Sequence, residues 1–145
     1  MSVEQSDDDT FDLDPWRDWV LCELVGMHNL LDEGEGFSIT LQLGGWLVSG
    51  KLIGGKQYFE RRAEEIATTV SEAEQDKVRE HFGSPSEMYG ENGTARSQPH
   101  FIHLCNARVY QAGSAPIPHN RGVLWRGKIS SVDAFWLGSL EAGRG

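Results

Sequence analysis

The feature that most constrains the fold is a pair of glycines between two apolar runs. In residues 37–43, written FSITLQL, apolar and polar side chains alternate, which is the period of a β-strand with one buried face. Gly44 and Gly45 follow, and they supply the positive φ angles that a tight two-residue turn needs before the second run, residues 46–53. The sequence therefore predicts an antiparallel hairpin, with Gly50 as a further turn or bend position inside its second strand.

The residues before the hairpin predict an acidic arm and a helix. Residues 1–13 hold five Asp or Glu and little apolar surface, so they are expected to be disordered. Asp14 suits the N-cap of a helix, and Pro15 suits its first position. The apolar residues that follow recur at intervals of three and four, which predicts one apolar stripe on a helix of about 17 residues. The members of this stripe are Trp16, Trp19, Val20, Leu24, Met27 and Leu31.

After the hairpin, the pattern changes to that of a helical insertion. Apolar residues in 57–82 lie roughly on one side of a helix, with a possible break at Thr68-Thr69. Residues 83–99 are rich in Gly, Ser, Pro and Asn with little apolar periodicity, which is typical of a mobile loop. Residues 56–99 are therefore expected to form a helix-plus-loop insertion between the second and third strands.

Three more strands are expected, in residues 100–110, 123–130 and 132–140. The order of elements predicts an α+β fold in which about five strands form a small, strongly bent antiparallel sheet or barrel. We expect a single domain over residues 14–140, with residues 141–145 as a tail. The length of 145 residues is enough for one such core.

The net charge of −9 is unevenly distributed. Residues 1–36 hold eleven acids and one base, whereas residues 96–145 hold two acids and six bases. This asymmetry favours intramolecular contact or head-to-tail self-association, and overall acidity argues against a nucleic-acid partner. No stretch is apolar enough to span a membrane, and the acidic N-terminus lacks the layout of a signal peptide, so we expect a cytoplasmic protein with no membrane partner.

Two sets of motifs resemble known proteins. A glycine-containing strand pair (GGWLVSGKLI), a Leu104-x-x-Ala107 strand and a later Arg126-Gly127 resemble the Sm-like barrel. The segments GFSITLQLGGWLVSGKLIGGKQYFE, HFIHLCNARVY and VLWRGKISSVDAFWLG look like the gas vesicle accessory protein GvpU family. The second resemblance implies a non-enzymatic protein that associates with gas vesicle shell proteins and brings vesicles together by weak multivalent self-association. The alternatives are an Sm-like RNA-binding regulator, which the first resemblance implies, and a generic small-barrel peptide adaptor.

Arg126, Gly127 and Lys128 lie between two apolar runs and allow two interpretations. Gly127 suits a strand bend or a close backbone approach, and strand alternation places Arg126 and Lys128 on the face opposite Trp125. Alternatively, Arg126 and Lys128 form with Arg108 a small basic face for an acidic partner segment, either a shell protein tail or the acidic arm of this chain. The RNA alternative also depends on Arg126.

The remaining polar motifs give weak evidence for chemistry. His103 and Cys105 share a strand face but His100 does not, and no second ligand pair has metal-site spacing. Cys22 and Cys105 are expected as buried thiols, because two distant cysteines form no disulfide framework. No phosphate loop, nucleophile elbow or carboxylate pair is present in the sequence, so we expect no enzyme, no metal and no cofactor.

The five tryptophans divide into two groups. Trp46 and Trp125 alternate with core-facing strand residues and are expected to be structural. Trp16, Trp19 and Trp136 are expected in the core if the first helix packs over the sheet. The alternative is that they form a docking face for another subunit or for a vesicle shell.

Overall fold

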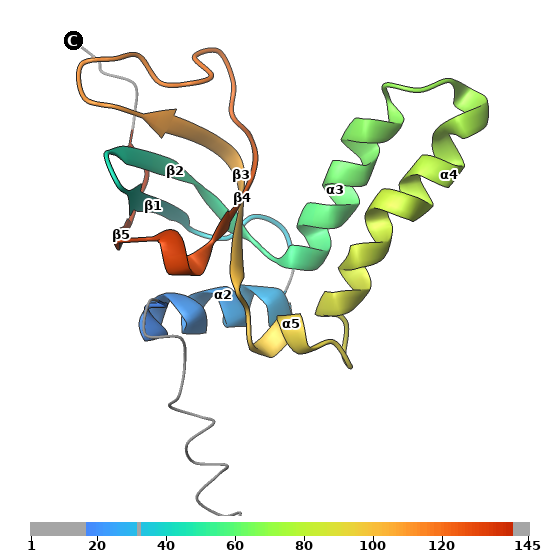
Figure 1. Cartoon of the computed structure of the whole chain (residues 1–145), viewed down its shortest axis with the longest axis horizontal. Coiled ribbons are helices and arrows are strands. Elements are labelled where there is room, and N and C mark those ends of the chain that lie inside the picture. The colour runs from blue at the N-terminus through green and yellow to red at the C-terminus, as the bar shows by residue number, and fades with distance from the viewer. Residues whose placement is uncertain (1–16, 32, 141–145) are drawn as a thin grey trace, which may run out of the picture.

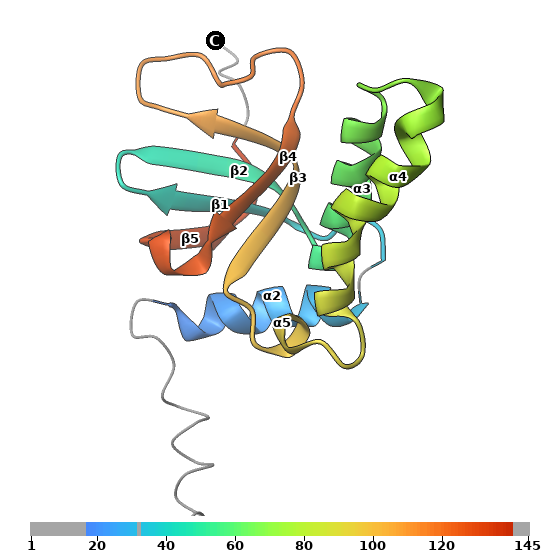
Figure 2. The ribbon, with the colours of Figure 1, turned by 45° about the vertical axis from the view of Figure 1, so that its right-hand side comes forward.

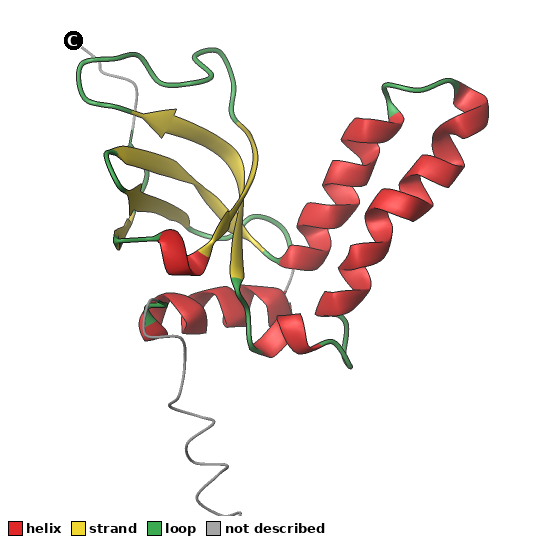
Figure 3. Ribbon diagram, in the orientation of Figure 1, coloured by secondary structure: helices red, strands yellow, loops and turns green. Residues whose placement is uncertain are grey.

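The computed structural model describes residues 17–31 and 33–140 (Figure 1). It contains a five-stranded antiparallel sheet, a helix α2 beneath it and a helical insertion beside it (Figure 3). The helical elements are α2 (Trp19–Leu31), α3 (Gly55–Ala67), α4 (Glu72–Gly83), the 3₁₀ turn η1 (Ser84–Tyr89), α5 (Thr94–Ser97) and the 3₁₀ turn η2 (Ile129–Ser131). The strands are β1 (Ser38–Leu43), β2 (Trp46–Ile53), β3 (Phe101–Tyr110), β4 (Val123–Lys128) and β5 (Ala134–Leu137). The expected fold class is confirmed.

The sheet has the order β4-β3-β2-β1-β5, so β4 and β5 are its two edges and the sheet is not closed. The predicted hairpin is confirmed, with Leu43 opposite Trp46 across a turn in which Gly44 has a φ of 63°. The backbone N–H of Gly44 also donates a 2.8 Å hydrogen bond to Oδ2 of Asp133, which ties the turn to the connection before β5. Gly44 therefore shapes the hairpin turn and also holds this turn against the segment that leads into β5.

The pairing of β2 with β3 is interrupted by a β-bulge. The register shifts between Ser49 and Lys51 on one strand, opposite Asn106, which has a positive φ of 52°. A Cβ at Gly50 would lie 2.9 Å from the carbonyl oxygen of Cys105, closer than real side chains approach. Gly50 is therefore required by the close approach of the two backbones at this bulge.

Helix α2 covers one face of the sheet and closes the main core, which we call the aliphatic cluster. Alternate residues of β1 contribute Ile39 and Leu41, as the strand period predicts, and α2 contributes Leu21 and Val25. The fully or largely buried members are Leu21, Cys22, Val25, Ile39, Leu41, Val48, Leu52, Ile102, Leu104, Ala107, Ile129 and Val132. Trp125 packs against this cluster, so its predicted structural role is confirmed.

The insertion forms an α3–α4 hairpin that stands beside the sheet (Figure 2). The predicted break at Thr68-Thr69 separates the two helices, and the Arg79 guanidinium links them through a 2.8 Å ion pair with Glu64. Residues 83–99 were expected to be a mobile loop, but they form η1 and α5 and bury Tyr89. Buried Asn29 of α2 explains this order, because its side chain donates to the carbonyls of Ala95 and Arg96.

Candidate interaction surfaces

The face of the sheet opposite α2 carries a second cluster, centred on His103. The rings of Tyr58, Phe59 and Tyr89 lie 4.6, 5.9 and 5.7 Å from the His103 ring, and His103 is completely buried. We call His103 with Tyr58, Phe59, Tyr89, Phe101 and Arg126 the aromatic cluster. It joins the insertion to the sheet, because α3 and η1 supply three of its rings while β3 and β4 supply the rest.

Arg126 is the polar centre of the aromatic cluster. Its Nη1 donates a 2.8 Å hydrogen bond to Nε2 of His103, and its guanidinium lies 3.7 Å from the Phe101 ring and 5.1 Å from that of Phe59. Burial and the Arg126 charge lower the pKa of His103 from 6.5 to about 3, so this imidazole is neutral. Because Nε2 accepts from Arg126, the proton lies on Nδ1, which has no partner among the described residues.

Of the three basic residues expected to form one face, Arg126 and Lys128 lie two residues apart on β4, whereas Arg108 lies at a distance from them on β3. Arg126 is engaged with His103 and Phe101 and does not stand free for a phosphate, so nothing here favours the RNA alternative. Lys128 is exposed two residues further along β4. Arg108 lies opposite Ser49 on β3, five residues from His103, which is about 16 Å along a strand.

Gly127 is explained by a close contact with its neighbour Trp125. A Cβ at Gly127 would lie 2.2 Å from the indole ring of Trp125. Trp125 therefore lies across the bare backbone of Gly127 as it packs on the aliphatic cluster, while Arg126 points to the aromatic cluster. Of the two expected reasons for this glycine, close approach is the one that the contacts support.

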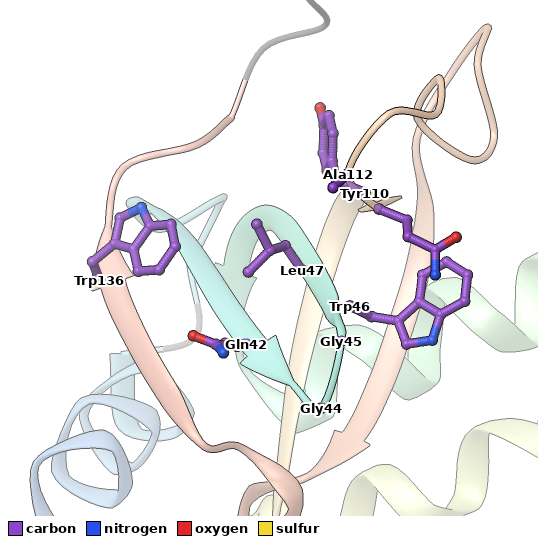
Figure 4. A pocket seen from close by; sticks show the side chains of 9 residues that line it. Gln42, Gly44, Gly45, Trp46, Leu47, Tyr110, Ala112 and Trp136 are labelled. Carbon is purple, nitrogen blue, oxygen red and sulfur yellow. The ribbon is translucent and has the colours of Figure 1, made fainter.

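An aromatic groove of about 440 Å³ lies near the hairpin turn (Figure 4). Trp136 of β5 borders it on one side, and Trp46 and Tyr110 border it on the other, with Leu47 between them. Trp46 is 41% exposed and Trp136 is 43% exposed. The expected place of Trp136 in the core is therefore wrong, because Trp136 lies on an edge strand. Trp46, expected to be structural, is the first residue of β2 and is also largely exposed.

The chain after β5 is fixed beside this groove. The Thr40 hydroxyl donates a 2.7 Å hydrogen bond to the carbonyl of Gly138, and the N–H of Leu140 donates a 2.8 Å bond to the Ser49 hydroxyl. The Tyr110 hydroxyl donates to the Leu140 carbonyl at 3.1 Å. These bonds hold the segment that carries Trp136, so one wall of the groove is set by the polar residues of β1, β2 and β3.

A second exposed apolar surface lies on α2. The face turned toward the sheet carries Leu21 and Val25, not the predicted stripe, whose member Leu24 is only partly buried. Trp19, 57% exposed, lies on the opposite side, so its expected place in the core is wrong. The stripe was misassigned because α2 is apolar on both sides and periodicity alone cannot choose between them. Trp16 lies outside the described residues.

The described residues show no clustered metal ligands. No group of three or more His, Cys, Asp or Glu in this part of the chain is arranged to hold a metal ion. Cys105 is buried, and burial together with the nearby Glu35 carboxylate raises the pKa of its thiol, which keeps it protonated. No helix in the described ranges is long and apolar enough to cross a membrane.

The fold and its surfaces define a class: an α+β protein with a bent sheet, a helical insertion and two exposed apolar surfaces suited to binding other macromolecules. The chain belongs to the gas vesicle protein GvpU-like family, whose model matches residues 18–140. The expected family is confirmed, and the protein is associated with gas vesicles. No curated protein and no solved structure matches the chain.

Proposed function

We propose that the protein binds gas vesicle shells in the cytoplasm and promotes their clustering by weak multivalent self-association, without catalysis. The observation that carries this proposal is the family match over residues 18–140. The two exposed apolar surfaces support it, because bringing large particles together requires that each molecule or oligomer engage at least two surfaces. One surface is the aromatic groove, and the other is the outer face of α2.

We assign shell binding to the aromatic groove. Its tryptophan and tyrosine rings present large apolar areas with polar tips, which is the composition of binding hot spots. The groove is also built on strands and fixed by the hydrogen bonds of Thr40, Ser49 and Tyr110, so little order is lost when it binds.

Charge adds a weaker, salt-sensitive contact. The arm of residues 1–13 lies outside the described residues, but its five acids and no bases complement exposed Lys128 and partly exposed Arg108. Arg126 is partly buried and engaged with His103 and Phe101, and it is a third candidate for this contact because it lies beside Lys128 on β4. Removal of residues 1–13 is therefore expected to change the salt dependence of self-association while leaving the sheet folded.

Co-flotation with purified gas vesicles tests the assignment. The full chain is expected to float with vesicles in a saturable manner, and Trp136→Ala is expected to weaken binding at least fivefold. Ile117→Ala is the matched control, because Ile117 is a similarly exposed apolar residue, 55% exposed, that does not line the groove. Absence of flotation by the unmodified chain would defeat the proposed function, and equal losses in both variants would defeat the groove assignment.

A further inference from the structure

Helix α2 has two apolar faces, and only one of them is covered by the described residues. The buried face contains Leu21, Cys22, Val25 and Asn29. The outer face exposes five large apolar side chains: Trp19 at 57%, Val20 at 48%, Met27 at 43%, Leu30 at 60% and Leu31 at 61%. Contiguous apolar surfaces of this kind mark interaction sites on soluble proteins.

The outer face is nearly symmetric about the middle of the helix. Val25 is the central residue of Trp19–Leu31. Trp19 and Val20 lie six and five residues before it, and Leu30 and Leu31 lie five and six residues after it. Glu23 and Met27 lie two residues on either side of the centre. The two ends of this surface are alike, and near its centre an acid on one side corresponds to an apolar residue on the other, so the surface is suited to an identical one that runs in the opposite direction.

We propose that the outer face of α2 binds the outer face of α2 in a second copy of this chain, with the two helices antiparallel. Trp19 and Val20 of one copy then pack on Leu30 and Leu31 of the other, and the same contact recurs at the other end. Each Glu23 lies at the level of Met27 of the second copy. This one contact covers both apolar ends of each helix, and it keeps the Glu23 carboxylates of the two copies apart.

Charge supports the antiparallel arrangement. Arg96 of α5 lines a groove of about 500 Å³ together with two acids, Glu23 and Glu91, and with Met27 and Leu30 of α2. Within the described ranges, Glu23 and Arg96 form no ion pair with any other described residue. A two-fold axis across antiparallel helices places α5 of both copies on the same side of the helix pair. In this arrangement Glu23 of each copy lies beside Met27 and Arg96 of the other.

This inference rests on the proposed function and deepens it by naming the self-association surface. A dimer joined through α2 carries two aromatic grooves, one per copy, and so offers two shell-binding surfaces on one particle. The dimer itself forms without vesicles. Its existence is therefore measured separately from flotation.

Sedimentation equilibrium of the full chain tests the dimer. The unmodified chain is expected to associate to a dimer, and Leu30→Glu is expected to weaken association at least tenfold, because two charges then enter the apolar interface. Leu137→Glu is the matched control, since Leu137 is also 60% exposed but lies on β5, and it is expected to associate normally. Circular dichroism checks that both variants remain folded. A chain that stays monomeric up to several hundred micromolar would overturn the proposal, whatever covers α2 instead.

A charge exchange tests the pairing of Glu23 with Arg96. Glu23→Arg and Arg96→Glu are each expected to weaken the dimer, and the double variant is expected to recover most of the affinity, because the opposite charges meet again across the interface. A double variant that associates no better than the single variants would overturn this arrangement of the two helices.

Cysteine cross-linking tests the direction of the helices. In the double variant Val20→Cys with Leu31→Cys, mild oxidation is expected to link two chains, because the two positions meet across the interface. Either single variant is expected to link poorly, because antiparallel packing leaves identical positions 20 about 15 Å apart at 1.5 Å per residue. Efficient linking of Val20→Cys alone would show parallel helices and overturn the proposal. The unmodified chain controls for Cys22 and Cys105, which are both buried.

Different results would contradict the α2 interface and the proposed function. If Leu30→Glu is a monomer that floats with vesicles and no longer clusters them, both proposals are supported. If the unmodified chain is a dimer but does not float, the α2 interface stands and the proposed function fails. If it floats and clusters vesicles as a monomer, the α2 interface fails and the proposed function stands.

Discussion

The two buried clusters on either side of the sheet differ in what they contain. The aliphatic cluster between α2 and the sheet is built mainly from branched apolar side chains of α2, of strands β1, β2 and β3, and of the turn before β5. The aromatic cluster under α3 is built from rings around a buried histidine and a guanidinium. The first holds the sheet together by apolar burial alone, whereas the second attaches the insertion through directional contacts.

Strands β3 and β4 serve both clusters through their alternation. Leu104 and Trp125 point to the aliphatic cluster, whereas their neighbours His103 and Arg126 point to the aromatic cluster. The motif Trp125-Arg126-Gly127 therefore contains one residue for each cluster and a glycine that makes room for the indole. A motif that looks like an anion site in the sequence is explained here by packing.

The largest expected effect comes from the aliphatic cluster. Leu104→Ala removes a completely buried side chain and is expected to lower the free energy of unfolding by about 3 kcal/mol, because a cavity remains in a close-packed core. Urea denaturation measures the change. Leu137→Ala is the control at an exposed position and should change stability by less than about 0.5 kcal/mol. A loss below about 1 kcal/mol for Leu104→Ala would contradict the central place of this cluster.

Removal of the guanidinium comes next. Arg126→Ala leaves Nε2 of buried His103 without its donor and removes the contact with Phe101, so we expect a loss of about 2 kcal/mol. Arg126→Lys is expected to recover only part of this loss, because an ammonium cannot stack flat on the ring. Denaturation of both variants gives the comparison, and full recovery by Lys would show that charge alone matters.

The third prediction is that acid weakens the aromatic cluster, because this cluster contains the buried imidazole of His103. The pKa of His103 is about 3 in the folded chain and 6.5 when unfolded, so between these values only the unfolded chain takes up the proton. As far as this group is concerned, the free energy of unfolding is therefore highest above pH 6.5, and it falls by about 1.4 kcal/mol per pH unit as the pH drops toward 3. Stability of His103→Gln against pH provides the reference, since this variant cannot titrate. Parallel pH profiles would mean that the imidazole is not buried neutral.

The smallest effect concerns the rim of the aromatic cluster. Arg62 donates to the Tyr58 hydroxyl at 3.0 Å and to the Leu124 carbonyl at 3.3 Å. Arg62→Gln is expected to cost less than about 1 kcal/mol, because this side chain is partly solvated. Arg61→Gln is the comparison: it loses a 3.9 Å exposed ion pair with Glu35 and a contact with the Cys105 thiol, and it should cost less than Arg62→Gln. Thermal unfolding compares the two, and a larger loss for Arg61→Gln would reverse the order.

Local patterns in the sequence predict much of this fold. Gly44 and Gly45 give the hairpin, strand alternation gives the buried Ile39 and Leu41, and the break at Thr68-Thr69 gives two helices. These features depend on neighbouring residues, so a single sequence contains the signal.

Features that depend on distant contacts were missed. Asn29 orders residues 94–97 from far away in the sequence, and no local pattern signals this. The aromatic cluster joins Tyr58 and Tyr89 to His103, and the only local hint is the pair Tyr58-Phe59 at the start of α3. The face of α2 that packs on the sheet was also predicted wrongly, because the helix is apolar on both sides and periodicity does not show which side is buried.

The pairing of β1 with β5 has a consequence for the order of folding. Thr40 and Gly138, which this pairing brings together, lie 98 residues apart in the chain, whereas the β1–β2 hairpin and the α3–α4 pair join near neighbours in the sequence. Long loops cost entropy before their contacts form, and synthesis proceeds from the N-terminus. The hairpin and the insertion can therefore assemble while the chain is still growing, but β1 keeps one bare edge until the last strand has been made.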